Sequence, residues 1–122
     1  MALGRNGHES MSRELTKSQK KRLRNLASVA YERELAAASK SLLREFRRWE
    51  QKEIDVFELN ERIHEFHNGI SRTLYSRYVG MDPGFGVARA IKSGVLKPTE
   101  LDDDLASLVS GMVEILSSPA FK

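Results

Sequence analysis

The sequence contains no cysteine, which excludes disulfide bonds, thiolate nucleophiles and cysteine-ligated zinc or iron–sulfur sites. Three of its 122 residues are proline and eight are glycine, a composition that favours helices. No apolar run approaches the ~20 residues of a membrane-spanning helix. Hydrophobic residues make up 40% of the chain and charged residues 30%, which is typical of a folded domain rather than a disordered chain.

The first ten residues lack the apolar core of a secretory signal and the arginine- and serine-rich pattern of a transit peptide. They also show no helical or strand periodicity. We therefore expect a disordered N-terminal tail over residues 1–12 and a single helical domain over residues 13–122. The expected location is the cytoplasm, the expected source bacterial, and no membrane partner is expected.

The strongest helical signal runs from about Thr16 to Gln51. Apolar or small residues recur there every three or four positions, which is the period of one face of an α-helix. They are Leu23, Ala27, Tyr31, Leu35, Ala38, Leu42, Phe46 and Trp49. A helix of this length measures roughly 50 Å and needs a partner surface along most of it, supplied by shorter helices, a second subunit or both.

Details of this segment suggest how it begins and packs. Thr16 or Ser18 offers an N-cap oxygen. Ala36, Ala37 and Ala38 are small, so a neighbouring backbone could approach closely there. At the other end, we expect Trp49 to anchor the turn against the next helix.

Shorter helices are expected after the turn at residues 51–54. Asp55 and Glu58 match a capping box, and apolar residues continue at helical spacing to Tyr78. Gly69 lies inside that segment and predicts a break or kink, with Ser71 capping the continuation; whether residues 56–78 form one kinked helix or two stays open.

Two further helices are expected near the C-terminus. One begins at Asp82-Pro83 and ends at Gly94, and the last runs from about Leu101 to Ser117. No strand pattern competes with these helices. The predicted fold is therefore all-α, with one long N-terminal helix and about four shorter helices packed along it.

The best candidate metal ligands are Glu61, His64 and His67. On a helix these residues are three apart in turn, so their side chains can share one side. A Glu-x-x-His pair has the spacing of di-iron carboxylate bundles, but those bundles need two pairs and two further carboxylates. The zinc-protease motif needs histidines four apart, so neither pattern is complete, although a homodimer could bring a second Glu61–His64 pair across a two-fold axis.

The same segment is also the best candidate for a pocket. Its polar residues stand out in a chain otherwise rich in Lys, Glu and Leu. The candidate pocket residues are His64, His67, Asn68, Arg72 and Tyr75. The competing interpretation is that the two histidines are half-buried beside the apolar face and hydrogen-bonded to the protein.

A basic patch is expected near the start of the long helix. Its members fall on one helical stripe, and Arg22 lies between them in the sequence. They are Lys17, Lys20, Lys21 and Arg24. The functional interpretation is a phosphate-contacting face for nucleic acid, whereas the competing one is an ordinary solvated surface, because no aromatic residues interleave with these charges.

Other catalytic patterns are absent from the sequence. There is no Gly-x-Ser-x-Gly elbow, and the glycines between Gly80 and Gly86 form neither a Walker loop nor a dinucleotide fingerprint. We interpret these glycines as turn residues. No cofactor is expected, and the balance leans against an enzyme.

Part of the chain resembles a known group of proteins. The residues that carry the resemblance are Ala30-Tyr31-Glu32, Trp49, Phe57-Glu58-Leu59, the run from Ile63 to Gly69, Arg72, Leu74, Tyr78, Ala88-Arg89-Ala90 and Gly94-Val95-Leu96. This pattern resembles a group of small all-helical bacterial proteins that have no assigned function. The resemblance implies a helical fold and no particular activity, cofactor or catalytic residue.

The distribution of charge bears on the function. Through Glu53 the chain carries 13 Lys and Arg against 7 Asp and Glu, whereas the remainder is neutral to acidic, for a total of +3. This division favours helices that pack on each other over a uniformly basic nucleic-acid binder. The leading hypothesis is a helical protein–protein interaction or regulatory module that binds itself, as a homodimer, or another protein. The alternatives are metal binding or catalysis at Glu61, His64 and His67, and nucleic-acid binding through the basic patch.

Overall fold

The computed structural model describes residues 15–118, which are helical and contain no strand. The fold is all-α, as the sequence predicts: one long N-terminal helix and four shorter α-helices. The expected disordered tail, residues 1–12, lies outside the described residues. No helix between residues 15 and 118 is both long enough and apolar enough to cross a membrane.

The long helix α3 spans Lys17–Glu50. It begins at Thr16, whose hydroxyl accepts a hydrogen bond from the Gln19 amide at 2.9 Å while the Gln19 side chain accepts one from the Thr16 amide at 3.0 Å. This reciprocal cap satisfies two of the amides that a helix start leaves free. The helix ends at Gln51, and Lys52 turns the chain with a φ of 64°.

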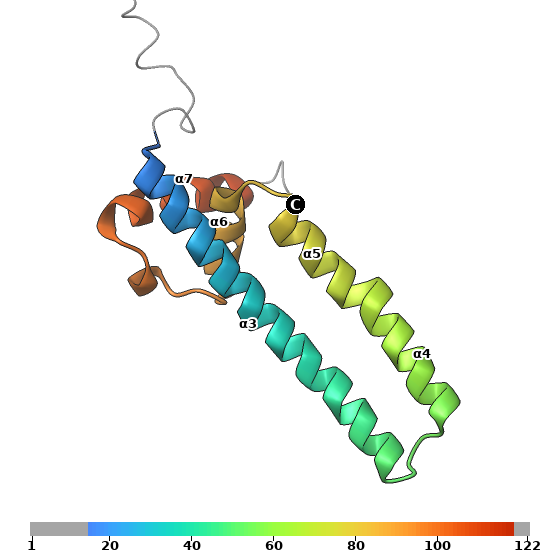
Figure 1. Ribbon diagram of the computed structural model, residues 1–122. Coiled ribbons are helices and arrows are strands. Elements are labelled where there is room, and N and C mark those ends of the chain that lie inside the picture. Colours follow the sequence, from blue (N-terminus) through green and yellow to red (C-terminus); the bar gives the residue numbers. More distant parts are fainter. Residues whose placement is uncertain (1–14, 119–122) are drawn as a thin grey trace, which may run out of the picture.

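The chain then returns antiparallel to α3, as Figure 1 shows, through α4 (Val56–Phe66), the π-helical segment η1 (His67–Ser71) and α5 (Arg72–Val79). The Asp55 carboxylate caps α4 by accepting from the Glu58 amide at 2.8 Å. The expected capping box is only half formed, because the Glu58 side chain pairs with Arg62 at 3.0 Å instead.

The sequence predicts a break or kink at Gly69, and the structure has a π-helical segment there rather than a break. The backbone stays in the right-handed helical region at Phe66, Ser71 and Arg72, and Ser71 makes no side-chain cap. The physical reason lies in the apolar spacing: Phe66, Ile70, Leu74 and Tyr78 are four residues apart, more than the 3.6 of an α-helical turn. A π turn holds roughly one extra residue and so keeps these side chains on one side of a continuous helix.

The C-terminal part comprises α6 (Pro83–Ser93), a 3₁₀ turn η2 (Pro98–Glu100) and α7 (Asp103–Leu116). Asp82 caps α6 and Gly94 ends it with a φ of 85°, both as predicted. The interpretation of Gly84 and Gly86 as turn residues is wrong, because both are buried inside α6. A Cβ on Gly84 would lie 2.9 Å from the Met112 Cε of α7, so Gly84 lets α6 and α7 pack closely, whereas a Cβ on Gly86 would lie 3.9 Å from the Ala27 Cβ of α3, an ordinary contact distance.

The molecule has a body and an arm. The body, residues 15–33 and 83–118, combines the first half of α3 with α6, η2 and α7 and contains the core. The core residues are Leu23, Ala27, Ala30, Val87, Ala88, Ala90, Leu96, Leu101, Leu105 and Val109. The arm, residues 34–79, is the two-helix hairpin that extends beyond the body in Figure 1, and its buried apolar residues are Ile54, Leu59 and Leu74.

Ion pairs join η2 and the start of α7 to α3. Arg22 binds Asp102 at 2.6 Å and Asp104 at 2.9 Å, and Arg33 binds Glu100 at 2.7 Å. The hydrogen bonds from Arg22 and then Gln19 lower the pKa of Asp104, and those from Arg33 and the Lys97 amide lower the pKa of Glu100 to about 2. These contacts fix η2 and the start of α7 beside the first half of α3.

The tip of the arm is less buried than its sequence predicts. The sequence predicts that Trp49 anchors the turn, but Trp49 is 40% exposed, and Phe46 is 37% exposed. Phe57, on the first turn of α4, is 79% exposed. Two helices alone cannot enclose side chains of this size, so apolar surface remains open along the arm.

Candidate functional site

The predicted metal ligands lie on the outside of the arm. Glu61 and His64 belong to α4 and His67 to η1, and all three residues are exposed. Within residues 15–118, no three His, Cys, Asp or Glu side chains are grouped so as to hold a metal ion. A site completed by a second copy stays a prediction.

The predicted pocket residues occupy the same outer surface. His64, His67, Asn68, Arg72 and Tyr75 are all exposed, with Tyr75 at 58%. The five cavities described in the protein are lined by other residues. A ligand role for His67 and Asn68 therefore stays a prediction.

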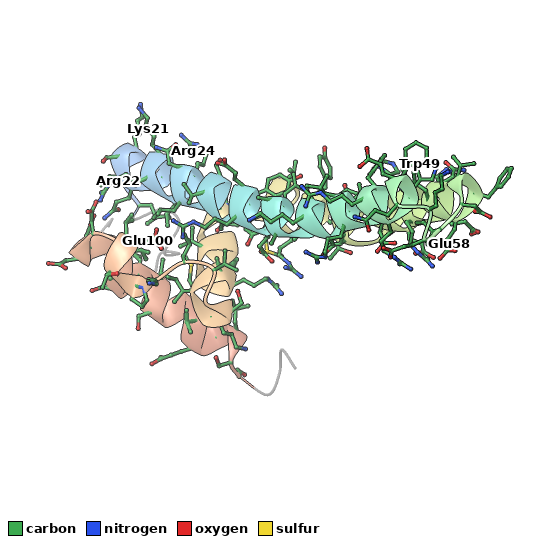
Figure 2. The ribbon with its side chains drawn as sticks, turned by 90° about the horizontal axis from the view of Figure 1, so that it is seen from below. Lys21, Arg22, Arg24, Trp49, Glu58 and Glu100 are labelled. Atoms are coloured by element: carbon green, nitrogen blue, oxygen red, sulfur yellow. The ribbon has the colours of Figure 1, made fainter. Side chains whose placement is uncertain are left out.

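The predicted basic patch is exposed, and the structure separates Arg22 from it. Figure 2 shows Lys21 and Arg24 on one side of α3 and Arg22 on the other, toward the acidic start of α7. Lys17 and Lys20 are exposed as well. The charge of Arg22 is thus neutralised inside the molecule, whereas the four patch residues make no ion pair among the described residues.

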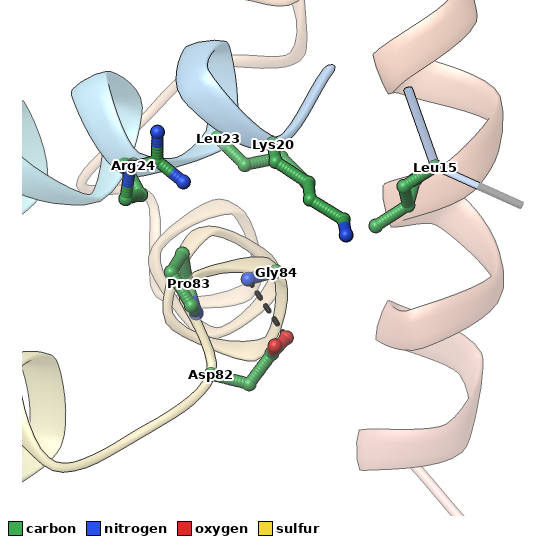
Figure 3. A pocket seen from close by; sticks show the side chains of 7 residues that line it. All are labelled: Leu15, Lys20, Leu23, Arg24, Asp82, Pro83 and Gly84. Carbon is green, nitrogen blue, oxygen red and sulfur yellow. Dashed lines mark hydrogen bonds between the residues drawn. The ribbon is translucent and has the colours of Figure 1, made fainter. Parts of the chain in front are cut away.

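Two patch residues line a cavity of about 280 Å³ between α3 and the start of α6, seen in Figure 3. Lys20 and Arg24 face Asp82 and Pro83 across it, and Leu15 and Leu23 complete an apolar wall. The Asp82 carboxylate accepts a hydrogen bond from the Gly84 amide at 3.0 Å and so caps the start of α6. Together with Lys20 and Arg24, it gives the residues that line the cavity a net charge of +1.

The largest hollows run along the arm. Two of them, of about 500 and 470 Å³, share Ala38 and Ile70 and together form what we call the arm groove, between α3 and α4–α5. The apolar floor consists of Ala37, Ala38, Leu42, Phe66, Ile70 and Leu74. Val95, from the loop after α6, bounds the groove at its body end.

The charged residues beside the groove are already paired within the chain. Glu34 accepts hydrogen bonds from Arg77, at 3.1 Å, and from the Tyr78 hydroxyl. Burial, and then the bond to Glu34, raises the pKa of the Tyr78 phenol. Arg62 binds Glu65 at 2.8 Å and Glu58 at 3.0 Å, and those hydrogen bonds raise the pKa of its guanidinium. The groove floor is therefore apolar and its edges are internally neutralised.

Sequence reasoning did not find this groove, although one signal pointed to it. The small residues Ala37 and Ala38 suggested that a backbone could approach α3 closely. Ala38 is partly buried and borders the open groove, and Ala37 is exposed. Ala38 and Leu42, two residues of the predicted apolar stripe of α3, therefore line open surface.

The arm groove and the Lys20–Arg24 cavity are the two features that geometry offers for binding. Neither arrangement contains a nucleophile with a base, or a metal-ligand set, among its lining residues. No protein-family model matches the chain, and no curated protein or solved structure shows significant similarity to it.

Proposed function

We propose that this protein is a helical interaction module that self-associates through its arm. The observation that carries the proposal is the arm groove, an apolar floor between two helices that α6 and α7 leave uncovered. An apolar groove of this kind gains free energy when water leaves it, at about 25 cal/mol for each Å² buried.

The composition of the arm supports this proposal. Ile70 is 43% exposed within the groove, and Leu43 and Phe46 remain 47% and 37% exposed on α3. Apolar side chains concentrated on a protruding hairpin are typical of interaction surfaces in helical proteins. Two arms that pack together would complete a four-helix arrangement that each arm begins.

The test is the mass of the purified protein as a function of concentration, measured by sedimentation equilibrium. We expect reversible formation of a species of twice the 13.8 kDa chain mass. Ile70→Asp, which places a charge in the groove, should shift the protein to monomer, whereas Tyr75→Asp on the outer surface should not. A wild-type protein that stays monomeric up to hundreds of micromolar contradicts the proposal.

A second candidate function is binding of an anionic partner, such as nucleic acid, at the basic patch. The favouring observation is that Lys20 and Arg24 line a cavity and lack an ion pair among the described residues. We expect a labelled single-stranded oligonucleotide to bind with an affinity that falls steeply with salt. Lys20→Ala/Arg24→Ala should weaken it more than Lys40→Ala/Arg47→Ala, which removes the same charge elsewhere on α3; equal effects would contradict a site at the cavity.

A further inference from the structure

We propose that the cavity between α3 and the start of α6 binds a small monocarboxylate that carries a short apolar chain. This inference rests on the second candidate function, anion binding at the basic patch, and names the anion. The carboxylate of the ligand lies between Lys20 and Arg24, and its apolar chain lies against Leu15 and Leu23. Binding requires only one copy of the protein.

Lys20 and Arg24 are placed to hold one anion between them. They are four residues apart on α3, so their side chains are neighbours on the helix surface. Figure 3 shows both on the α3 side of the cavity, with Asp82 and Pro83 on the α6 side. Like charges at this spacing repel each other. A bound carboxylate removes that repulsion and can accept two parallel hydrogen bonds from the Arg24 guanidinium.

The cations on the two sides of this part of α3 differ in their partners. On the far side, Arg22 is neutralised by Asp102 at 2.6 Å and by Asp104 at 2.9 Å. On the cavity side, neither Lys20 nor Arg24 forms an ion pair with any residue between 15 and 118. An anionic ligand therefore meets two cations that no described carboxylate has taken.

The charge of the lining favours a ligand with a single negative charge. The two cations and the Asp82 carboxylate sum to +1. A carboxylate brings the site to neutrality. A phosphate monoester carries a charge of about −1.5 to −2 at pH 7 and would leave the site negative beside Asp82.

The size and the walls of the cavity define the rest of the ligand. Its volume of about 280 Å³ equals that of roughly nine waters in the liquid, so it holds about that many non-hydrogen atoms. Leu15, Leu23 and Pro83 form its apolar wall, and Leu23 is fixed in the core at 2% exposure. No aromatic side chain lines it for a nucleic-acid base to stack on. Hexanoate matches both this size and this chemistry.

A titration of the ¹⁵N-labelled wild-type protein with hexanoate, followed by NMR, tests the proposal. We expect saturable shifts of the Lys20, Arg24 and Gly84 amide signals at millimolar concentrations. Trp49 is the single tryptophan of the chain and lies at the other end of α3 in Figure 2, so its indole signal should not move. The absence of a saturable shift up to tens of millimolar overturns the proposal, as does an equal shift of the Trp49 signal.

Two further ligands separate the charge from the apolar chain. Hexan-1-ol keeps the chain and lacks the charge, whereas acetate keeps the charge and lacks most of the chain. Each should bind at least roughly tenfold more weakly than hexanoate, because each makes only half of the contacts. Hexan-1-ol that binds as tightly as hexanoate overturns the role of the cations. Acetate that binds as tightly overturns the role of the apolar wall.

Substitutions locate the cations that hold the carboxylate. Lys20→Met/Arg24→Met keeps apolar stems and removes both charges, so hexanoate should bind roughly tenfold more weakly. Lys40→Met/Arg47→Met removes the same charge elsewhere on α3 and should leave the affinity within about twofold. Asp82→Asn keeps a capping side chain and removes the negative charge, so hexanoate should bind roughly threefold more tightly. Equal weakening in the two double variants, or weaker binding to Asp82→Asn, overturns the site.

The outcomes separate this inference from the function on which it rests. An oligonucleotide that binds the basic patch and is not displaced by hexanoate leaves anion binding standing and overturns the carboxylate site. Circular dichroism of each variant shows whether the helical fold is kept. If a variant loses its helical signal, the hexan-1-ol and acetate titrations of the wild-type protein still decide the proposal.

Discussion

Tyr31 on α3 and Tyr78 on α5 stack at the base of the arm, with ring centroids 5.4 Å apart and planes inclined by 18°. The Tyr78 hydroxyl also donates to Glu34, one turn further along α3. Tyr78→Phe keeps the stacking and removes the hydrogen bond, so we expect the free energy of unfolding to fall by about 1 kcal/mol in urea denaturation. Tyr75→Phe, whose ring is exposed, is the control and should change stability little; an equal loss in both variants contradicts a role for the Glu34 contact.

The π-helical segment predicts an unusual tolerance to deletion. Removing Gly69 should let residues 67–71 become α-helical while Leu74 and Tyr78 keep their side of the helix, because the π turn holds the extra residue. We expect this variant to stay folded, with its stability within about 1 kcal/mol of the wild type, a small change by the usual scale of mutations.

Deletion of Ala37 is the matched control, because α3 has no π turn to absorb it. That deletion rotates the remainder of α3 by about 100° relative to α4 and should unfold the arm. Thermal denaturation followed by circular dichroism distinguishes the two variants. Comparable loss of structure in both would show that the π turn does not set the register.

Gly86, inside α6, and Gly94, at its C-terminal cap, should respond differently to substitution by alanine. A Cβ on Gly86 meets ordinary van der Waals contacts at 3.6 Å and beyond, so Gly86→Ala should gain up to about 1 kcal/mol of helix propensity. Gly94 has a φ of 85°, which costs an L-residue energy, so Gly94→Ala should lower stability by about 1 kcal/mol. Chemical denaturation of both variants checks the two signs, and a destabilised Gly86→Ala would contradict the first.

The ion pairs of the body predict that the stability of the folded protein falls at acidic pH. The pKa of Glu100 falls from its ordinary value of 4.5 to about 2 in the folded protein, so its ionised form stabilises the fold above pH 4.5. That contribution is lost as the pH falls from 4.5 toward 2, and the thermal midpoint should fall with it. Arg33→Met removes the partner and should reduce the drop; an identical pH profile in the variant contradicts this assignment.

The periodicity and the capping residues of the sequence were enough to predict most helices. Thr16, Asp55, Asp82 and Gly94 act where they were expected, because caps depend on neighbouring residues alone. The π-helical form of the irregularity at Gly69 and the place of Gly84 inside α6 could not be predicted, because they depend on register and on packing against other helices. The register at Gly69 required three spacings of four residues to be considered together, and the contact of Gly84 with Met112 joins distant parts of the chain.

In the candidate site, too, the features set by neighbouring residues were predicted and those set by tertiary packing were not. The basic patch was predicted from local spacing, and its residues are exposed as expected. The arm groove was not predicted, because it exists only where α3 and α4–α5 lie side by side and the body ends. Leu42 and Ile70 look like ordinary core positions in the sequence, and tertiary structure alone leaves them beside an opening.

The order of the chain gives the arm a further property. The body is assembled from two separate stretches, residues 15–33 and 83–118, and the arm is inserted between them as one continuous stretch. Arg22 and Asp104, 82 residues apart, meet only when the ends of that insertion are close together. The arm thus behaves as a spacer of adjustable reach: removing matched heptads from α3 and α4 would shorten it by about 10 Å each while the joint with the body stays the same.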